Sequence, residues 1–256
     1  MLKFFRRIRR KFLVEGNLRK YLVYAIGEIL LVVIGILIAL QVNNINELKK
    51  ENELASEYLK NLKLNLESDL AAIESALISL KDSEEAGYYS LGVIEGRIDS
   101  TDKERFIRSL IENNRYQMVS PARATYDDLI STGNLKLLKN TILKEALSMY
   151  YSPGNAWQLF EERMKDTYWY TVREEIFKHI DPFALKAFYE STLYPVQEPT
   201  IKYDDIKIDY SKLRNEPALR NMIVRALALR VRQRKGLENR IFQINEVIEI
   251  LNKELY

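Results

Sequence analysis

The side chain with the clearest capacity for chemistry is Glu28, because it interrupts an apolar run that covers residues 22–42. An ionised carboxylate that faces lipid costs several kcal/mol, so this group should be neutral, paired or hydrated. Three roles stay open for Glu28: it reaches towards the cytoplasmic interface, it hydrogen-bonds to a second helix, or it conducts ions or protons. Replacement by glutamine distinguishes the last role from the others, because an amide cannot titrate.

A ridge of small residues accompanies Glu28 along the same run. Gly35 and Ala39 stand four residues apart, and small side chains at that spacing allow a second membrane helix to approach closely. Glu28 precedes Gly35 by two helical turns, which places the two residues within about 20° of each other around the helix axis. The predicted helix-contact residues are Gly27, Glu28, Leu31, Gly35 and Ala39.

Groups suited to enzymatic or metal chemistry are scarce in the rest of the chain. His179 is the only histidine and there is no cysteine, which excludes thiol catalysis, a Cys–His zinc site and a multi-histidine metal site. Glu175 precedes His179 by one helical turn, but a di-iron bundle site would need a different spacing and a second copy. No nucleophile-elbow or phosphate-loop motif occurs. We therefore expect no enzyme, catalytic residue, cofactor or metal, and interpret His179 as a satisfied surface or interface residue.

The run that contains Glu28 has the length of a membrane span. At about 1.5 Å per residue it covers roughly 30 Å, the thickness of a hydrocarbon core. A cleavable signal peptide is the competing interpretation, but its apolar core would be shorter, and Ala39-Leu40-Gln41 is a poor cleavage site. We predict an uncleaved anchor with a basic tail over residues 1–20, a transmembrane helix over 21–42 and a helical extracytoplasmic domain over 43–256.

Charge is distributed unevenly around this span. Residues 1–20 carry eight Lys or Arg and one acidic residue, and such positive flanks are retained in the cytoplasm. The predicted location is the bacterial inner membrane, as a single-pass protein with a cytoplasmic N-terminus and a periplasmic C-terminal domain. The tail indicates either an amphipathic helix on anionic headgroups or a disordered topogenic segment. Its predicted lipid contacts are Arg6, Arg7, Arg9, Arg10 and Lys11.

Outside the tail the chain is slightly acidic. It holds 31 basic and 35 acidic residues there, so the pI near 8.8 reflects the tail alone. A domain with this balance is not expected to bind nucleic acid. Because it lacks cysteine, its core must hold the outer domain without disulfides, which about 200 residues can do.

Periodic leucines and isoleucines predict an all-α outer domain built on two long helices. The transmembrane helix continues as a stalk to about residue 86, with an apolar stripe over residues 59–80. The second helix begins at Asn215-Glu216-Pro217, where a capping side chain precedes proline, and carries a heptad seam over residues 237–255. Their similar lengths favour antiparallel packing.

If the second helix returns towards the membrane, opposite charges meet across this pair. The basic residues are Arg230, Arg232, Arg234 and Lys235, and the acidic residues are Glu67, Asp69 and Glu74.

Capping patterns predict shorter helices between the long pair. Thr101 with Glu104 forms a capping box at the start of the first of them. Ser120-Pro121 opens the next helix, which Gly133 ends in the left-handed conformation.

The remaining segments carry weaker signals. Helices are expected over residues 143–150 and 157–171, followed by a short one that starts at Asp181-Pro182. Residues 193–213 are predicted to form an extended connection or a weak hairpin.

Two motifs resemble an uncharacterised family of bacterial single-pass membrane proteins, a domain of unknown function. The first is YAIGEI at residues 24–29 followed by VIGILIALQVNN at 33–44, and the second is YDDLISTGNL at 126–135. The resemblance extends over the whole chain. It implies a membrane location and a helical outer domain, and it brings no activity, ligand or catalytic residue. Taken by itself, the second motif indicates a helix, a glycine stop and a tight turn.

Two main functions follow from these observations. The first is a non-enzymatic, oligomeric inner-membrane protein whose helical periplasmic domain is a scaffold or binding module for an unidentified partner. The alternative is a small ion- or proton-conducting channel or stator-like subunit that uses Glu28. A hydrolase without a recognisable motif is a third hypothesis. Flux across liposomes and the oligomeric state separate the first two.

Overall fold

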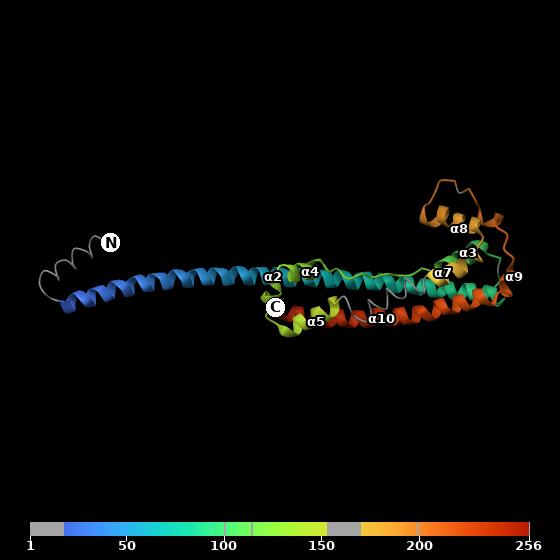
Figure 1. Cartoon of the computed structure of the whole chain (residues 1–256). Helices are drawn as coiled ribbons and strands as arrows, with labels where there is room; N and C mark the ends of the chain where they lie inside the picture. The colour runs from blue at the N-terminus through green and yellow to red at the C-terminus, as the bar shows by residue number, and fades with distance from the viewer. Residues whose placement is uncertain (1–17, 100, 114, 153–169, 199, 256) are drawn as a thin grey trace. The chain divides into compact units, whose positions relative to one another are not determined.

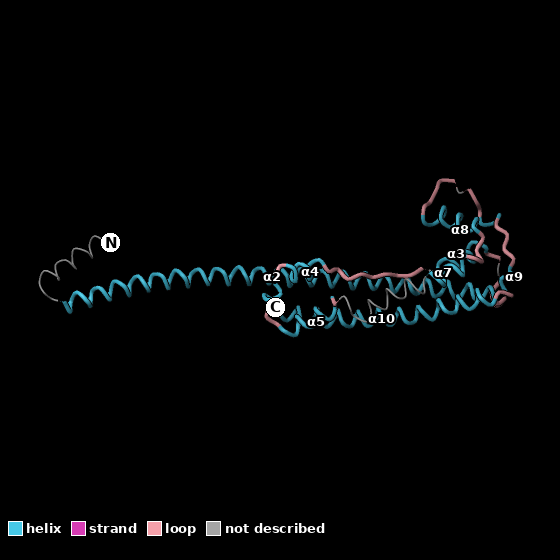
Figure 2. Tube along the Cα trace, viewed as in Figure 1, coloured by secondary structure: helices cyan, strands magenta, loops and turns pink. Residues whose placement is uncertain are grey.

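The structure is a computed structural model that describes residues 18–99, 101–113, 115–152, 170–198 and 200–255. These residues form helices and loops without a strand, so the predicted all-α class is confirmed (Figure 2). The α-helices are α2 (Leu18–Ile94), α3 (Lys103–Glu112), α4 (Ala124–Ser131), α5 (Thr141–Tyr151), α7 (Tyr170–Phe177), α8 (Pro182–Phe188), α9 (Tyr210–Arg214) and α10 (Pro217–Leu255) (Figure 1). Single turns are η1 (Asn134–Leu137), η3 (Tyr189–Leu193) and η4 (Tyr203–Asp205). The chain divides into two compact units, residues 1–57 and 58–256.

The first unit contains the apolar part of α2. Its most apolar window has a mean hydropathy of 2.7, and none of that window is buried. A core helix of a soluble protein would bury one face of such a window, whereas a membrane span presents it to lipid. By length and composition, α2 is the one helix among the described residues that can cross a membrane. The predicted lipid contacts in the tail lie outside the described residues.

The second unit is built on α10 and on the part of α2 that starts at Tyr58, which lie side by side and run antiparallel, as predicted (Figure 1). Buried residues on both helices recur at alternating steps of four and three, the spacing of a continuous seam. On α2 they are Leu62, Leu66, Asp69, Ile73, Ala76, Leu80, Ser83, Gly87, Ser90 and Ile94. On α10 they are Leu219, Ile223, Ala226, Arg230, Gln233, Leu237, Arg240, Ile244, Val247 and Leu251.

α2 ends eight residues later than the predicted end near residue 86. Gly87 does not stop the helix, because it lies inside the seam, where its missing side chain makes room for Asn113 and Leu227. The helix ends instead before Gly96, which adopts a φ of +72°. Left-handed glycine at this position is the usual helix stop.

The predicted charge pairing between the long helices is correct in kind and wrong in register. Arg234 pairs with Glu84 of α2, and Arg220 Nε lies 2.9 Å from Glu95 Oε1. Arg234 therefore meets a residue ten positions beyond Glu74. Near the end of α10, Leu251 belongs to the core cluster that also contains Leu62 and Leu66 of α2.

Two predicted helix starts are displaced, and one predicted capping residue is wrong. The cap of α3 is Asp102, whose carboxylate accepts the Arg105 N–H, and not Thr101. α4 begins at Ala124 instead of Pro121, because the segment before it is held in an extended conformation, as described below. Asn215 does not cap α10: its amide donates to the Ser211 carbonyl at the end of α9.

Other local predictions are confirmed. Pro217 opens α10, Gly133 has a φ of +69° after α4, and Asp181 caps α8 through the Phe183 N–H. α5 fits the helix expected over 143–150. The helix predicted over 157–171 lies almost wholly outside the described residues.

The connection over 193–213 is extended in part, as predicted. The alternative prediction of a weak hairpin is wrong, because the described residues of this segment form no strand. Instead of a second strand, the chain forms η4 and then α9. Asp209 starts α9 by accepting the Lys212 N–H, a capping signal that the alternating isoleucines concealed.

Candidate functional site

The predicted helix-contact residues all lie on α2 in the first unit. A Cβ built on Gly27 or Gly35 meets nothing within 4 Å, so this ridge is open to a second helix. Leu31 and Ala39 are exposed, whereas Glu28 is half-buried. The ridge therefore has the geometry that close helix packing in a membrane needs.

In the second unit, polar residues of the α10 seam hold a segment that we name the strap, residues 112, 113 and 115–123. Arg230 donates to the carbonyl of Asn113, and the Gln233 amide donates to the Gln117 carbonyl at 2.6 Å. Arg240 Nη1 donates to the Val119 carbonyl at 2.9 Å. Each of the three seam residues is at least 95 % buried. An extended segment has no helical hydrogen bonds of its own, so these side chains supply the partners that its backbone needs.

Asp69 fixes the other end of the strap. Its Oδ1 accepts the Ala122 N–H at 2.8 Å, and its Oδ2 accepts the Tyr150 hydroxyl at 2.7 Å. Arg240 Nη2 lies 3.4 Å from the same hydroxyl, so Tyr150 bridges the buried acid and the buried base. Burial raises the pKa of the Tyr150 hydroxyl above its ordinary value. This hydroxyl is therefore a structural donor, held protonated at neutral pH.

We call Arg230, Gln233 and Arg240 the polar seam, and its hydrogen bonds position the strap. Burial lowers the pKa of the Arg230 guanidinium to about 10, which leaves it charged at neutral pH. Its guanidinium donates hydrogen bonds to carbonyl groups of the strap, at Glu112, Asn113 and Arg115.

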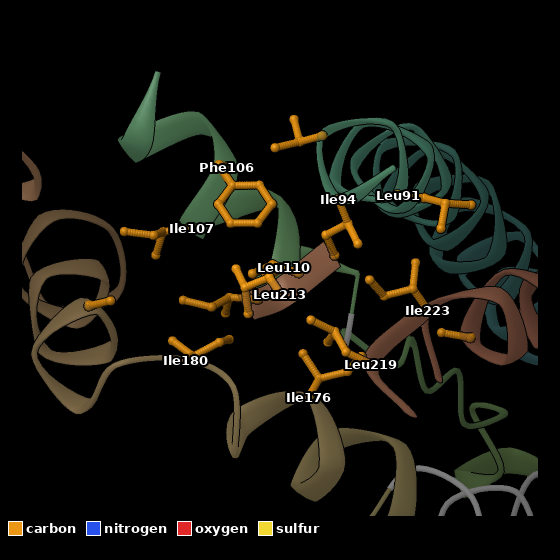
Figure 3. Close-up of a cluster of buried hydrophobic side chains, with 14 of the residues drawn as sticks. Leu91, Ile94, Phe106, Ile107, Leu110, Ile176, Ile180, Leu213, Leu219 and Ile223 are labelled. Atoms are coloured by element: carbon orange, nitrogen blue, oxygen red, sulfur yellow. The ribbon is translucent and has the colours of Figure 1, made fainter. Parts of the chain in front are cut away.

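His179 lies at a separate place, beside a cavity of about 310 Å³ in the second unit. The cavity is bounded by α3, by the segment between α7 and α8, and by the segment that leads into α9. Its apolar wall includes Phe106, Ile107, Leu110, Ile180 and Leu213, which face one another in Figure 3. All five side chains are buried and belong to the core cluster at this end of the unit.

Polar groups surround the mouth of this cavity. They are Lys178, His179, Asp181, Lys207, Asp209 and Lys212. Lys178 pairs with Glu175 at 2.8 Å, and this hydrogen bond lowers the pKa of the Glu175 carboxyl. His179 Nε2 lies 3.6 Å from Glu175 Oε1 and has no hydrogen-bond partner among the described residues. The interpretation of His179 as a satisfied residue is therefore wrong for this nitrogen.

The two carboxylates at the mouth are used within the fold. Asp181 Oδ1 accepts the Phe183 N–H at 2.8 Å. Asp209 Oδ1 accepts the Lys212 N–H at 3.0 Å, which lowers the pKa of the Asp209 carboxyl. Both acids cap short helices, each through one of its two carboxylate oxygens.

No set of three or more potential metal-ligating side chains comes together in the described part of the chain.

Comparison with protein-family models gives one match, over residues 28–187. This match covers more than half of the chain. The chain belongs to DUF6090, a family of unknown function. Searches of the curated proteins and of the solved structures found no match.

The DUF6090 match includes most of the first motif, the whole second motif, Asp69, Tyr150 and His179, and it ends within α8. Arg230, Gln233 and Arg240 lie beyond it, as do the lysines that follow α8. The family therefore confirms the resemblance to a domain of unknown function, over residues 28–187 in place of the whole chain.

Sequence reasoning missed the polar seam and the cavity. Arg230, Gln233 and Arg240 do stand at heptad positions, so extending the apolar seam of α10 towards its start would have shown them. The cavity has no comparable signal, because its walls come from three segments that are distant in the sequence.

Proposed function

We propose that this DUF6090 protein is a membrane-anchored, non-enzymatic scaffold that self-associates through its spanning helix. The observation that carries the proposal is the apolar window of α2, which is wholly unburied and has open space over Gly27 and Gly35. Apolar helix surface of this length is satisfied by lipid, and a small-residue ridge within it favours a second copy of the helix. The chain is thus a single-pass protein, and the partner on the ridge is the same chain.

The rest of the proposal follows from charge. The basic tail places the N-terminus in the cytoplasm of a bacterial cell and lets Arg6 to Lys11 contact anionic headgroups. The helical domain then lies in the periplasm, where it presents binding surfaces to a protein or small-molecule partner.

The test is self-association of the full chain in lipid nanodiscs or liposomes, measured by energy transfer between labelled copies. Gly35→Leu should abolish most of the transfer, because the larger side chain holds the backbones apart. Val33→Phe adds the same number of side-chain carbon atoms, four, on the opposite face of the helix and serves as the matched control, since it should leave transfer unchanged. A parent that shows no transfer above a dilution control would overturn the proposal.

Glu28→Gln separates the scaffold from a channel. If Glu28 supports helix association, the amide keeps most of the transfer, because it still donates and accepts hydrogen bonds. Proton or cation flux into liposomes is measured on the same samples. Flux in the parent that disappears in Glu28→Gln, with transfer intact, would replace the scaffold by a conducting subunit.

A further inference from the structure

We propose that the cavity beside His179 is a binding site for a small amphipathic anion, of which a medium-chain alkyl carboxylate is the simplest example. The proposal concerns the second unit alone and goes beyond the scaffold function. Whether the spanning helix self-associates has no bearing on it.

The size and lining of the cavity define the tail of this ligand. Its volume of about 310 Å³ lies at the small end of ligand pockets. At roughly 30 Å³ per water-sized group, it holds on the order of ten non-hydrogen atoms. The inner wall is formed by buried Phe106, Ile107, Leu110 and Ile206, which offer no hydrogen bond to a ligand. An alkyl chain fits that surface better than a sugar or a nucleotide does.

The polar mouth defines the head of the ligand. Asp181 and Asp209 already accept backbone N–H groups, and Lys178 already pairs with Glu175. Lys207 and Lys212 also border the cavity, and neither ammonium group lies within ion-pair distance of a carboxylate among the described residues, although Lys212 acts electrostatically on Asp209. Lysines outnumber aspartates among the lining residues, and the ammonium groups of Lys207 and Lys212 can donate to an anionic head.

His179 adds a second polar element to the lining of the cavity. Its Nε2 atom is buried and has no hydrogen-bond partner among the described residues. A buried ring nitrogen in this state costs free energy unless a ligand or water occupies the position next to it. A carboxylate held by Lys207 or Lys212 would bring an oxygen to this part of the mouth, where the imidazole can hydrogen-bond to it.

The binding experiment uses the full chain in lipid nanodiscs, with empty nanodiscs as the blank for partition into lipid. Octanoate, 1-octanol and octyltrimethylammonium share one tail and differ in the head, and each is titrated by calorimetry. We expect saturable binding of octanoate, weaker binding of octanol and none of the cation. Absence of saturable octanoate binding above the blank, or equal binding of octanoate and octyltrimethylammonium, would overturn the proposal.

Charge variants test the head group without disturbing the core. Lys207 and Lys212 are exposed, so the double variant Lys207→Gln/Lys212→Gln should fold like the parent. Octanoate binding should weaken about tenfold or more in it, while octanol binding changes by less than about twofold. Lys202→Gln removes an exposed lysine of the same segment that does not border the cavity, and it should bind octanoate like the parent. Unchanged octanoate affinity in the double variant would refute the cationic mouth.

A filling variant tests the tail. Ala184 borders the cavity and is 1 % exposed, so Ala184→Phe should occupy the space that the alkyl chain needs. When Ala184→Phe melts at the same temperature as the parent, we expect it to bind neither octanoate nor octanol. If octanoate still binds to such a folded variant as it does to the parent, the ligand does not enter this cavity.

Discussion

Replacing Asp69 by leucine should destabilise the second unit strongly. The side chain is 2 % exposed and accepts two hydrogen bonds, from the Ala122 N–H and the Tyr150 hydroxyl. Asp69→Leu is close in volume, but it leaves both donors buried without an acceptor. It also removes the negative charge that Tyr150 connects to Arg240. An unpaired buried charge and two orphaned donors remain.

The size of the effect can be worked from these contacts. A hydrogen bond to a charged group contributes about 1.5–3 kcal/mol, and removing one partner of a buried ion pair costs about 3–5 kcal/mol. The two ranges describe the same contacts and are therefore not added together. We expect a loss of about 4 kcal/mol in the free energy of unfolding. For a domain of this size, about 1 kcal/mol shifts the Tm by roughly 2–4 °C, which predicts a fall of about 8–16 °C.

The assay is a double-mutant cycle followed by thermal unfolding of the chain in detergent. Asp69→Leu/Arg240→Met removes both charges and should regain much of the loss, because the basic group no longer lacks its counter-charge. The Val119 carbonyl loses a donor in this variant, so recovery should be incomplete. A Tm for Asp69→Leu within about 2 °C of the parent, or strictly additive single effects, would refute the bridged ion pair.

Three further changes test the fold and the topology. Ile244→Asp buries a carboxylate at a fully buried seam position and should cost several kcal/mol in a thermal melt, whereas the exposed neighbour Asn245→Asp should cost almost nothing. Gly87→Ala should cost about 1–3 kcal/mol by the same measurement, because its Cβ would lie 2.5 Å from Asn113 Oδ1 and 2.8 Å from Leu227 Cδ2. Asn245→Cys, the only cysteine in the variant, should react with a membrane-impermeant thiol reagent in intact spheroplasts. Labelling only after lysis would place the helical domain in the cytoplasm.

The two long helices were predictable because their signals are local and repeat many times. Steps of three and four along α2 and α10 mark the seam wherever the residues are apolar, and Pro217 marks the start of α10. Even so, Leu70 and Leu77 lie at the edge of the seam and stay partly exposed, while Asp69 and Ala76 take the buried places beside them. Hydropathy alone ranks these neighbours in the wrong order.

The register between the helices was not predictable from charge. Charged residues occur along both helices, so many offsets bring opposite charges together, and exposed pairs contribute too little to choose among them. The observed offset follows from how the apolar residues of both helices pack into shared core clusters. Non-local packing of this kind leaves no mark in a single sequence.

Local capping signals were decisive only where no stronger contact competed. Asp181 and Pro182 start α8 as expected, and the Asp181 carboxylate accepts the Phe183 N–H there. Ser120 and Pro121 carry an equally good signal, yet α4 starts later. There the Val119 carbonyl and the Ala122 N–H are held by Arg240 and Asp69, and these buried contacts keep the chain extended.

The polar seam also explains why the long helices do not slide by one heptad. A purely apolar seam would lose little by such a slip, since one apolar side chain would replace another at each position. Here the partners of the seam are single carbonyl groups of the strap, at Asn113, Gln117 and Val119. A shift of α10 by seven residues would place Leu237 where Arg230 now lies, and the buried carbonyl of Asn113 would lose its donor. The three polar residues therefore penalise every neighbouring register, because a buried acceptor without a donor costs about 1–3 kcal/mol.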